Sequence, residues 1–218
     1  MTDRLKIYNG ALMILGERDL ASLTEERESR RKLDQVWNDG GVRRMLEMAQ
    51  WKFAMRASRV DYDAGVSPEW GFRRAFAKGD DWVVTSAVCQ DELYRVPLVR
   101  YLDEIGYWWA DLDTIYVRYV SDGAQYGGDL SRWPSTFTDA VKGYFAQRIV
   151  ASVQGASEGK IDQVEKAAER LLRTAKNKDA MAGPQQFVAP GTWVQSRSGG
   201  YGTKGPFGDG GSVSSLTG

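Results

Sequence analysis

Apolar side chains near the start of the chain recur at the spacing of one face of a helix. Four of them follow one another at intervals of three or four residues: Leu5, Tyr8, Leu12 and Leu15. Thr2 is placed to cap this helix, and Gly16 comes directly after the pattern. Because glycine readily takes the left-handed conformation that ends a helix, the pattern predicts a first helix that stops at Gly16.

A second helical pattern leads to residue 54. Ser22 followed three residues later by Glu25 has the form of a capping box, so we expect the helix to begin there. Gly40-Gly41 interrupts its apolar face, at about 1 kcal/mol per glycine relative to alanine. We favour one continuous helix over a break, ending at Trp51-Lys-Phe-Ala54, where the spacing becomes strand-like. The apolar face is formed by Leu33, Val36, Trp37, Met45, Met48 and Ala49.

Between residues 59 and 121, short aromatic and β-branched runs alternate with turn residues. The runs that predict strands are 70–76, 82–84, 95–102, 107–109 and 114–120. Turns rich in aspartate and glycine separate them. We therefore expect a small antiparallel sheet.

Helical spacing returns after the glycine-rich loop 121–134. A third helix is expected from Ser135 or Thr136, and a fourth ends near Ala182, before Gly183-Pro184. These elements predict an α+β, mainly α fold: a four-helix bundle with an antiparallel β subdomain inserted between the second and third helices. The expected limits are 1–56 and 133–182 for the bundle, 57–132 for the inserted subdomain and loop, and 183–218 for an extended arm.

The last 36 residues contain ten glycines and three prolines, too many for a packed domain. Apolar residues punctuate them nonetheless: Phe187, Val188, Trp193, Val194, Tyr201 and Phe207. A flexible linker has no need of tryptophan, so we favour an arm that becomes ordered on a partner. The alternative is a disordered tail with incidental aromatic residues.

Composition narrows the possible chemistry. The 29 basic and 29 acidic residues cancel, so no global field directs the chain to nucleic acid or anionic lipid. Histidine is absent, which excludes Ser-His and Cys-His catalysis and removes the usual zinc ligand. The single cysteine, Cys89, excludes an internal disulfide and fits a small core residue better than a nucleophile. Without a signal peptide or membrane span, we expect a soluble, intracellular setting with no membrane contact.

Candidates for chemistry are confined to turns and charged patches. Three aspartate pairs could bind a hard cation: Asp80-Asp81, Asp111 with Asp113, and Asp122 with Asp129. Aspartate is common in turns for backbone reasons, so we favour a structural role. The glycine-rich segment 123–128 matches neither a dinucleotide loop nor a phosphate loop. A basic set could face DNA, but interleaved acids favour a neutral surface; its members are Arg43, Arg44, Lys52, Arg56 and Arg59.

The first turns of the second helix carry a dense mixture of charges: Glu25, Glu26, Glu28, Arg30, Arg31 and Lys32. We favour a solvated face with pairs four residues apart. The alternative is a charged seam against a neighbouring subunit.

Five segments, in their order and spacing, resemble one protein family. They are LMILGERDLASLTEE at 12–26, Trp51-Lys-Phe-Ala54, Trp70-Gly-Phe72, the run 115–120, and Trp133-Pro-Ser-Thr-Phe137. Over residues 1–182 the chain resembles the head-to-tail adaptor proteins of tailed bacteriophages, which include tail tubular protein A of short-tailed phages and the adaptors of gene transfer agents. Two departures are the missing proline before aspartate between residues 76 and 88, and the length of the tail.

The resemblance implies a non-enzymatic ring of twelve subunits, without cofactors, between the portal and the tail or next connector. The protein would be located at the head–tail junction of the virion and would be assembled in the host cytoplasm. Packaged DNA would pass through the ring without sequence-specific binding. Subunit contacts would use the six charged residues above together with Arg43, Arg44, Arg170 and Arg173. The aromatic arm would dock on the portal or a neighbour, and Trp108, Trp109 and Tyr126 would face the tail. The rivals are a DNA-binding virion protein and a metal-dependent hydrolase using the turn aspartates.

Overall fold

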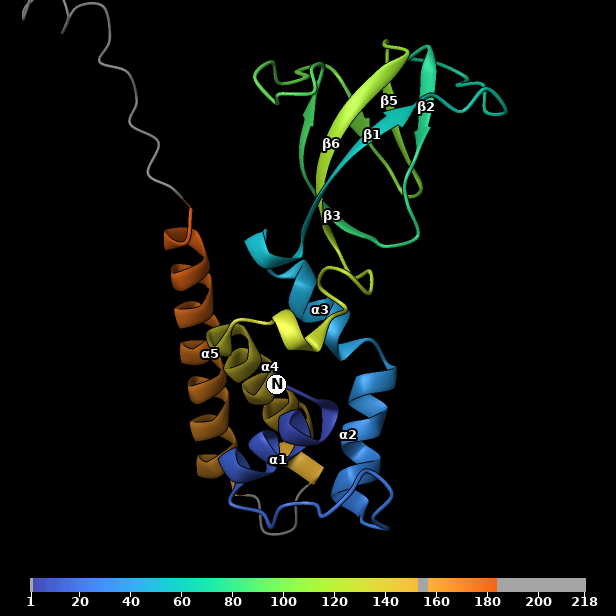
Figure 1. The fold of residues 1–218 in the computed structure, drawn as a ribbon. Coiled ribbons are helices and arrows are strands. Elements are labelled where there is room, and N and C mark those ends of the chain that lie inside the picture. Colours follow the sequence, from blue (N-terminus) through green and yellow to red (C-terminus); the bar gives the residue numbers. More distant parts are fainter. Residues whose placement is uncertain (1, 153–156, 184–218) are drawn as a thin grey trace, which may run out of the picture. The chain divides into compact units, whose positions relative to one another are not determined.

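The computed structural model describes residues 2–152 and 157–183, which belong to one compact unit. Within this part the fold is mixed α+β, with five α-helices and six strands in two small antiparallel sheets. All six strands lie between the third and fourth helices in sequence, and Figure 1 shows strands and helices as separate groups. No helix in the described ranges has both the length and the apolar character needed to cross a membrane.

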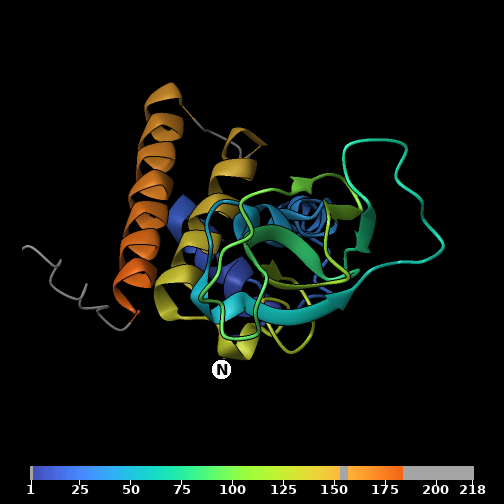
Figure 2. The same ribbon diagram turned by 90° about the horizontal axis from the view of Figure 1, so that it is seen from above.

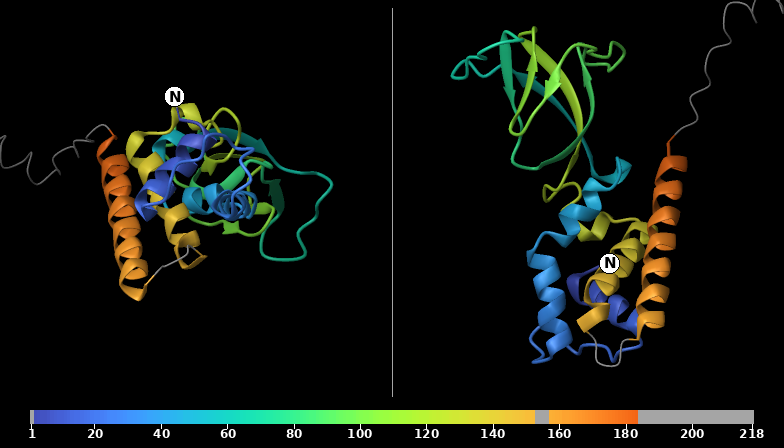
Figure 3. Two further views of the ribbon diagram at one scale, coloured as in Figure 1. Left: turned by 90° about the horizontal axis from the view of Figure 1, so that it is seen from below. Right: turned by 180° about the vertical axis from the view of Figure 1, so that it is seen from behind.

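The helical group is built around α4 (Ser135–Ile149), which packs against α1 (Arg4–Leu15) and α5 (Glu158–Met181). Figure 3 shows α5 alongside α4 from two directions. Gly143 permits this approach, since a Cβ there would meet the Cα of Ala168 at 3.2 Å. The buried face of α4 includes Phe137, Val141 and Phe145, as the helical spacing predicted.

The ends of the first helix are set by its caps. Asp3, rather than Thr2, is the N-cap, because its side chain accepts from the backbone N–H of Lys6. Gly16 ends the helix in the left-handed conformation, with φ at 72°. The predicted stop is therefore confirmed, and the predicted cap is wrong by one residue.

The expected continuous second helix is wrong. The chain forms α2 (Glu28–Asn38) and α3 (Gly41–Glu47), separated at Gly40, which has a φ of 79°. A Cβ on Gly41 would lie 2.6 Å from the carbonyl oxygen of Val36, so the break needs both glycines. The expected capping box is also wrong, because the Glu25 carboxylate accepts from the backbone N–H of Ala21, before the helix begins.

The six strands form two three-stranded sheets. In the first, β6 (Thr114–Ser121) lies between β1 (Met55–Asp61) and β3 (Trp82–Cys89). In the second, β5 (Tyr107–Ala110) lies between β2 (Arg74–Ala77) and β4 (Leu102–Asp103). Figure 2 shows the long loop between β1 and β2 extending away from the helices.

Three strand predictions change in the structure. The run 70–76 is a strand only from Arg74, and the run 95–102 is mostly loop, joined to β3 by one bridge between Cys89 and Pro97. The strand β1 was missed, because its charged side chains hide the alternation. Each of its seven residues pairs with β6, so the pairing partner defines it.

Two apolar cores result. The first lies among the helices and reaches the first sheet through Val83 and Val120. Trp51 is central to it, with 1% of its surface exposed, its indole N–H donating to the Met45 carbonyl at 2.8 Å, and its ring 4.8 Å from that of Phe137. The second core lies between the sheets and contains Phe76, Val88, Trp108, Ile115 and Val117.

Candidate protein-docking surface

Large apolar side chains are exposed mainly on the loops of the second sheet. Of the ten that are exposed among the described residues, six lie between positions 70 and 105: Trp70, Leu93, Val96, Val99, Leu102 and Ile105. Trp70 is 82% exposed and Ile105 fully exposed. Large apolar side chains exposed in this way are candidate contacts for a partner protein.

A pocket of about 380 Å³ opens on this surface. It is lined by residues 67–72 of the β1–β2 loop and by Leu102, Glu104 and Trp109 of the β4–β5 hairpin, and we call it the Trp70–Trp109 pocket. Its volume falls in the range, about 300–1,000 Å³, of sites that enclose most of a ligand. Trp109 is positioned by a hydrogen bond from its indole N–H to the Glu104 carboxylate, at 2.9 Å.

The loop that forms one wall is held to the sheet by polar contacts. Arg100 donates to the carbonyl of Gly71 at 3.2 Å, and its guanidinium lies 5.4 Å from the centre of the Phe72 ring. The backbone N–H of Arg73 donates to the Asp111 carboxylate at 3.0 Å. Gly71 has a φ of 82°, which turns the loop so that its aromatic neighbours flank the pocket. These contacts fix the wall at Gly71, Phe72 and Arg73.

The three residues expected to face the tail have different environments. Trp108 is 1% exposed and donates to the Thr85 hydroxyl at 2.9 Å, so its assignment to a partner surface is wrong. Its neighbour Trp109 lines the pocket, because successive strand residues point to opposite faces. Tyr126 is half-buried, with the Arg56 guanidinium 5.8 Å from its ring.

The most exposed apolar residues, Trp70, Val99 and Ile105, were not assigned to a partner surface from the sequence. Trp70 was assigned to a strand, and a strand predicts that alternate residues are covered. The signal that could have found Ile105 is its position between Glu104 and Gly106, since an isoleucine in a tight polar turn has no core to enter.

The charged start of α2 is largely paired within the chain. Glu25 pairs with Arg18 at 2.8 Å, Glu26 with Arg31 at 2.5 Å, and Arg30 with Asp34. A backbone hydrogen bond from Ala21 holds the pKa of Glu25 below its usual value. Of these pairs, only Arg30 with Asp34 has the four-residue spacing expected for the solvated face. Glu28 and Lys32 instead line a shallow pocket of about 230 Å³.

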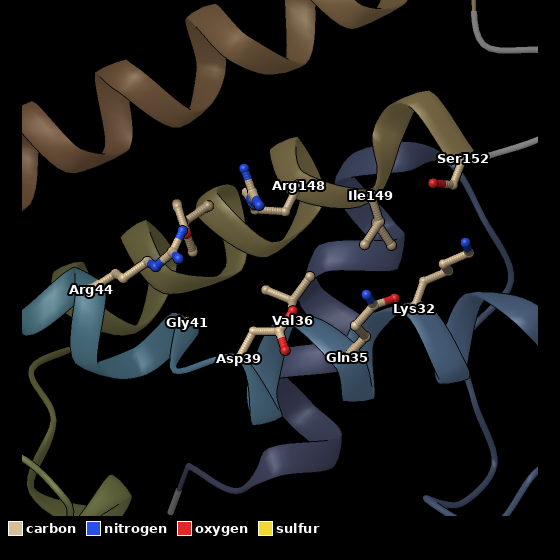
Figure 4. Close-up of a pocket in the computed structure, with 10 residues that line it drawn as sticks. Lys32, Gln35, Val36, Asp39, Gly41, Arg44, Arg148, Ile149 and Ser152 are labelled. Atoms are coloured by element: carbon tan, nitrogen blue, oxygen red, sulfur yellow. The ribbon is translucent and has the colours of Figure 1, made fainter.

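Lys32 also contributes to a pocket of about 160 Å³ between α2, α3 and α4, shown in Figure 4. Arg44 and Arg148 enter it from α3 and α4, and Asp39 lies on the same wall. Within the ranges that the structure describes, Lys32, Arg44 and Arg148 make no ion pair, whereas Arg30 and Arg43 on the same two helices do. Polar and charged side chains therefore dominate this pocket, in contrast to the exposed apolar side chains between residues 70 and 105.

The expected basic set is distributed over internal contacts. Arg43 pairs with Asp122 and donates to the Trp82 carbonyl at 2.6 Å, which ties α3 to the first sheet. The other partners are Asp81 for Arg56, Asp61 for Arg59 and the Ala180 carbonyl for Lys52. Arg170 and Arg173 are exposed on α5. The arm residues Phe187, Val188, Trp193, Val194, Tyr201 and Phe207 lie outside the described residues.

The turn aspartates make structural bonds. Asp81 accepts from Arg56 at 2.8 Å, from Tyr119 at 3.1 Å and from Ser121. Burial alone would raise the pKa of Asp81, but these hydrogen bonds outweigh it and hold the pKa below its usual value. Burial also raises the pKa of Tyr119 to about 12. Across the described residues, no three histidine, cysteine or acidic side chains are grouped to hold a metal ion.

Cys89 lies in the core, with 3% of its surface exposed, and burial raises the pKa of its thiol. This agrees with its prediction as a core residue.

A scan of protein-family models finds no match to the chain, and no curated protein matches it.

Proposed function

We propose that this protein is a head-to-tail adaptor of a tailed bacteriophage, a non-enzymatic structural component of the virion. It would form a ring beneath the portal and join it to the tail or next connector. The observation that carries the proposal is the concentration of exposed apolar side chains between residues 70 and 105, while the helices present mainly charged residues. A connector needs such chemically different surfaces, because it meets different partners on each side.

The proposal gives the two groups of elements separate roles. The strands form a β subdomain inserted into a helical bundle, in which α2 and α3 together take the place of the expected second helix. This reading is supported by the sequence order of the elements, with every described strand between α3 and α4. The apolar surface of the subdomain faces the tail, and Trp109 contributes to it.

Subunit contacts in the ring are polar in this proposal. Lys32 and Arg44 favour this assignment, since neither makes an ion pair with another described residue, and Arg170 and Arg173 are exposed on a second surface, that of α5. A ring of twelve identical subunits needs two complementary surfaces on each copy. The aromatic arm, residues 183–218, docks on the portal or on a neighbouring subunit and becomes ordered there.

The test is negative-stain imaging of the purified protein mixed with its portal. We expect twelve-fold rings attached to one face of the portal, and none when Lys32 and Arg44 are both changed to glutamate. As a control, reversing the charge of Glu92, an exposed loop residue, should leave attachment to the portal intact. A protein that ignored the portal but bound duplex DNA with steep salt dependence would favour the DNA-binding alternative.

A further inference from the structure

The walls of the Trp70–Trp109 pocket combine aromatic rings with carboxylates. Trp70, Phe72 and Trp109 supply the rings, and Glu69 and Glu104 supply the carboxylates. None of the residues lining it is lysine or arginine. An apolar side chain by itself would fit the rings but would leave the two carboxylates without a cation; the Trp109 indole that donates to Glu104 is neutral.

The surrounding sequence is strongly acidic. Segments 61–72 and 102–113 hold seven acidic residues and neither lysine nor arginine, in a chain whose charges cancel overall. Four of the seven are paired with bases from other segments: Asp61, Asp103, Asp111 and Asp113. Asp63, Glu69 and Glu104 make no ion pair in the described part of the chain, and the two glutamates line the pocket. The pocket therefore has an excess of negative charge.

Elsewhere in the β part, the same two components hold cations of the chain itself. Lys78 contacts Asp103 at 2.5 Å and lies 3.6 Å from the centre of the Trp82 ring. Arg74 contacts Asp113 at 3.0 Å and lies 3.9 Å from the centre of the Tyr62 ring. The negative face of an aromatic ring and a carboxylate attract the same cation, and their effects add.

We propose that the Trp70–Trp109 pocket binds an arginine side chain carried on a segment of a partner protein. The apolar stem of the arginine would lie against the indoles, and its planar guanidinium would reach the carboxylates of Glu69 and Glu104. Exposed apolar residues beside the pocket, such as Ile105, would contact apolar neighbours of the arginine in that segment. The assignment goes beyond the proposed function, because it specifies the chemistry of a ligand and does not require a ring.

The experiment uses the full-length protein and a fluorescein-labelled peptide, Gly-Leu-Arg-Leu-Gly-amide, followed by fluorescence polarisation. Its control peptide carries citrulline, which has the shape of arginine without the charge. We expect saturable binding that weakens at least tenfold with citrulline and weakens as salt is raised. Competition by the unlabelled arginine peptide separates pocket binding from binding of the dye.

Variants of the lining residues test whether the arginine peptide binds in the Trp70–Trp109 pocket. Glu69→Gln with Glu104→Gln should weaken the arginine peptide about tenfold, and glutamine at position 104 still accepts from the Trp109 indole. Trp70→Ala should weaken it several-fold without unfolding the protein, since Trp70 is 82% exposed. Glu92→Gln, an exposed carboxylate that does not line the pocket, should change nothing.

Equal affinity for the citrulline peptide, or unchanged binding by the double glutamine variant, would overturn the assignment. So would unchanged affinity of the Trp70→Ala protein for the arginine peptide. These results would leave the adaptor proposal intact, because ring formation and portal attachment are observed separately by imaging.

Discussion

Trp51 and Trp70 lie at opposite extremes of burial. Trp51 is 1% exposed, packs against Phe137 and has a hydrogen-bond partner for its indole, whereas Trp70 is 82% exposed. The residue type is the same, so any difference in their contribution to stability comes from their surroundings. This pair separates the scaffold from the candidate docking surface.

Replacing Trp51 with alanine should lower the free energy of unfolding by about 3–5 kcal/mol, because it leaves a large cavity in the helical core. Trp70→Ala should change it by no more than about 0.5 kcal/mol. Urea unfolding followed by circular dichroism measures both. A Trp51→Ala protein as stable as the parent would show that the core described around it does not contribute as proposed.

Asp81 links stability to pH. Its folded-state pKa lies below the unfolded value of about 3.9, so its contribution is complete above about pH 4 and is lost as pH falls through the folded value. The free energy of unfolding, measured from pH 7 to pH 2, should therefore fall less steeply with pH in Asp81→Asn than in the parent. Asp80→Asn, at the exposed neighbouring position, should retain the parent slope. The remaining slope comes from other carboxyls with lowered pKa: Glu25, Glu26, Asp61, Asp91 and Asp129.

At the scale of elements, the break between α2 and α3 directs the chain from the helices toward the strands. Gly40 has a φ of 79°, a conformation that costs a residue with a Cβ about 1–2 kcal/mol. Gly40→Ala should therefore destabilise the protein by that amount in chemical denaturation.

The matched control is Gly159→Ala. Gly159 lies in the first turn of α5, with no heavy atom within 4 Å of an added Cβ, so alanine should stabilise the protein by about 0.5–1 kcal/mol. If both substitutions had the same sign and size, the difference in backbone conformation would not be the cause.

Element predictions succeeded where the pattern is local. The end of α1 at Gly16 and the end of α5 near Ala182 follow from residues that terminate helices whatever surrounds them. The strand β1 and the helix break at Gly40 were missed, because each depends on a distant or space-limited contact. The pairing of β1 with β6 joins residues about 60 positions apart, which no short window contains.

At the scale of the whole molecule, we propose different roles for the folded unit and for the C-terminal arm, residues 183–218. Met1–Gly183 is one compact unit, so a protein truncated after Gly183 should keep the circular dichroism spectrum and unfolding midpoint of the parent. It should lose attachment to the portal in mixed samples viewed by negative stain. A truncated protein that joined portal rings as the parent does would remove the arm from the mechanism.

The sequence by itself determined the class of the fold, the helix ends at Gly16 and near Ala182, the absence of histidine chemistry and the burial of Trp51 and Cys89. These depend on residue type and spacing, which are local. Only the tertiary structure decided that Trp108 is buried while Trp109 lines a pocket, and that Glu69 and Glu104 lie together. The reason is physical: a side chain's exposure and its charged neighbours depend on which distant segments pack beside it. Here the β1–β2 loop is held by Asp111, which follows β5, through the backbone of Arg73, and by Arg100, which precedes β4, through the carbonyl of Gly71.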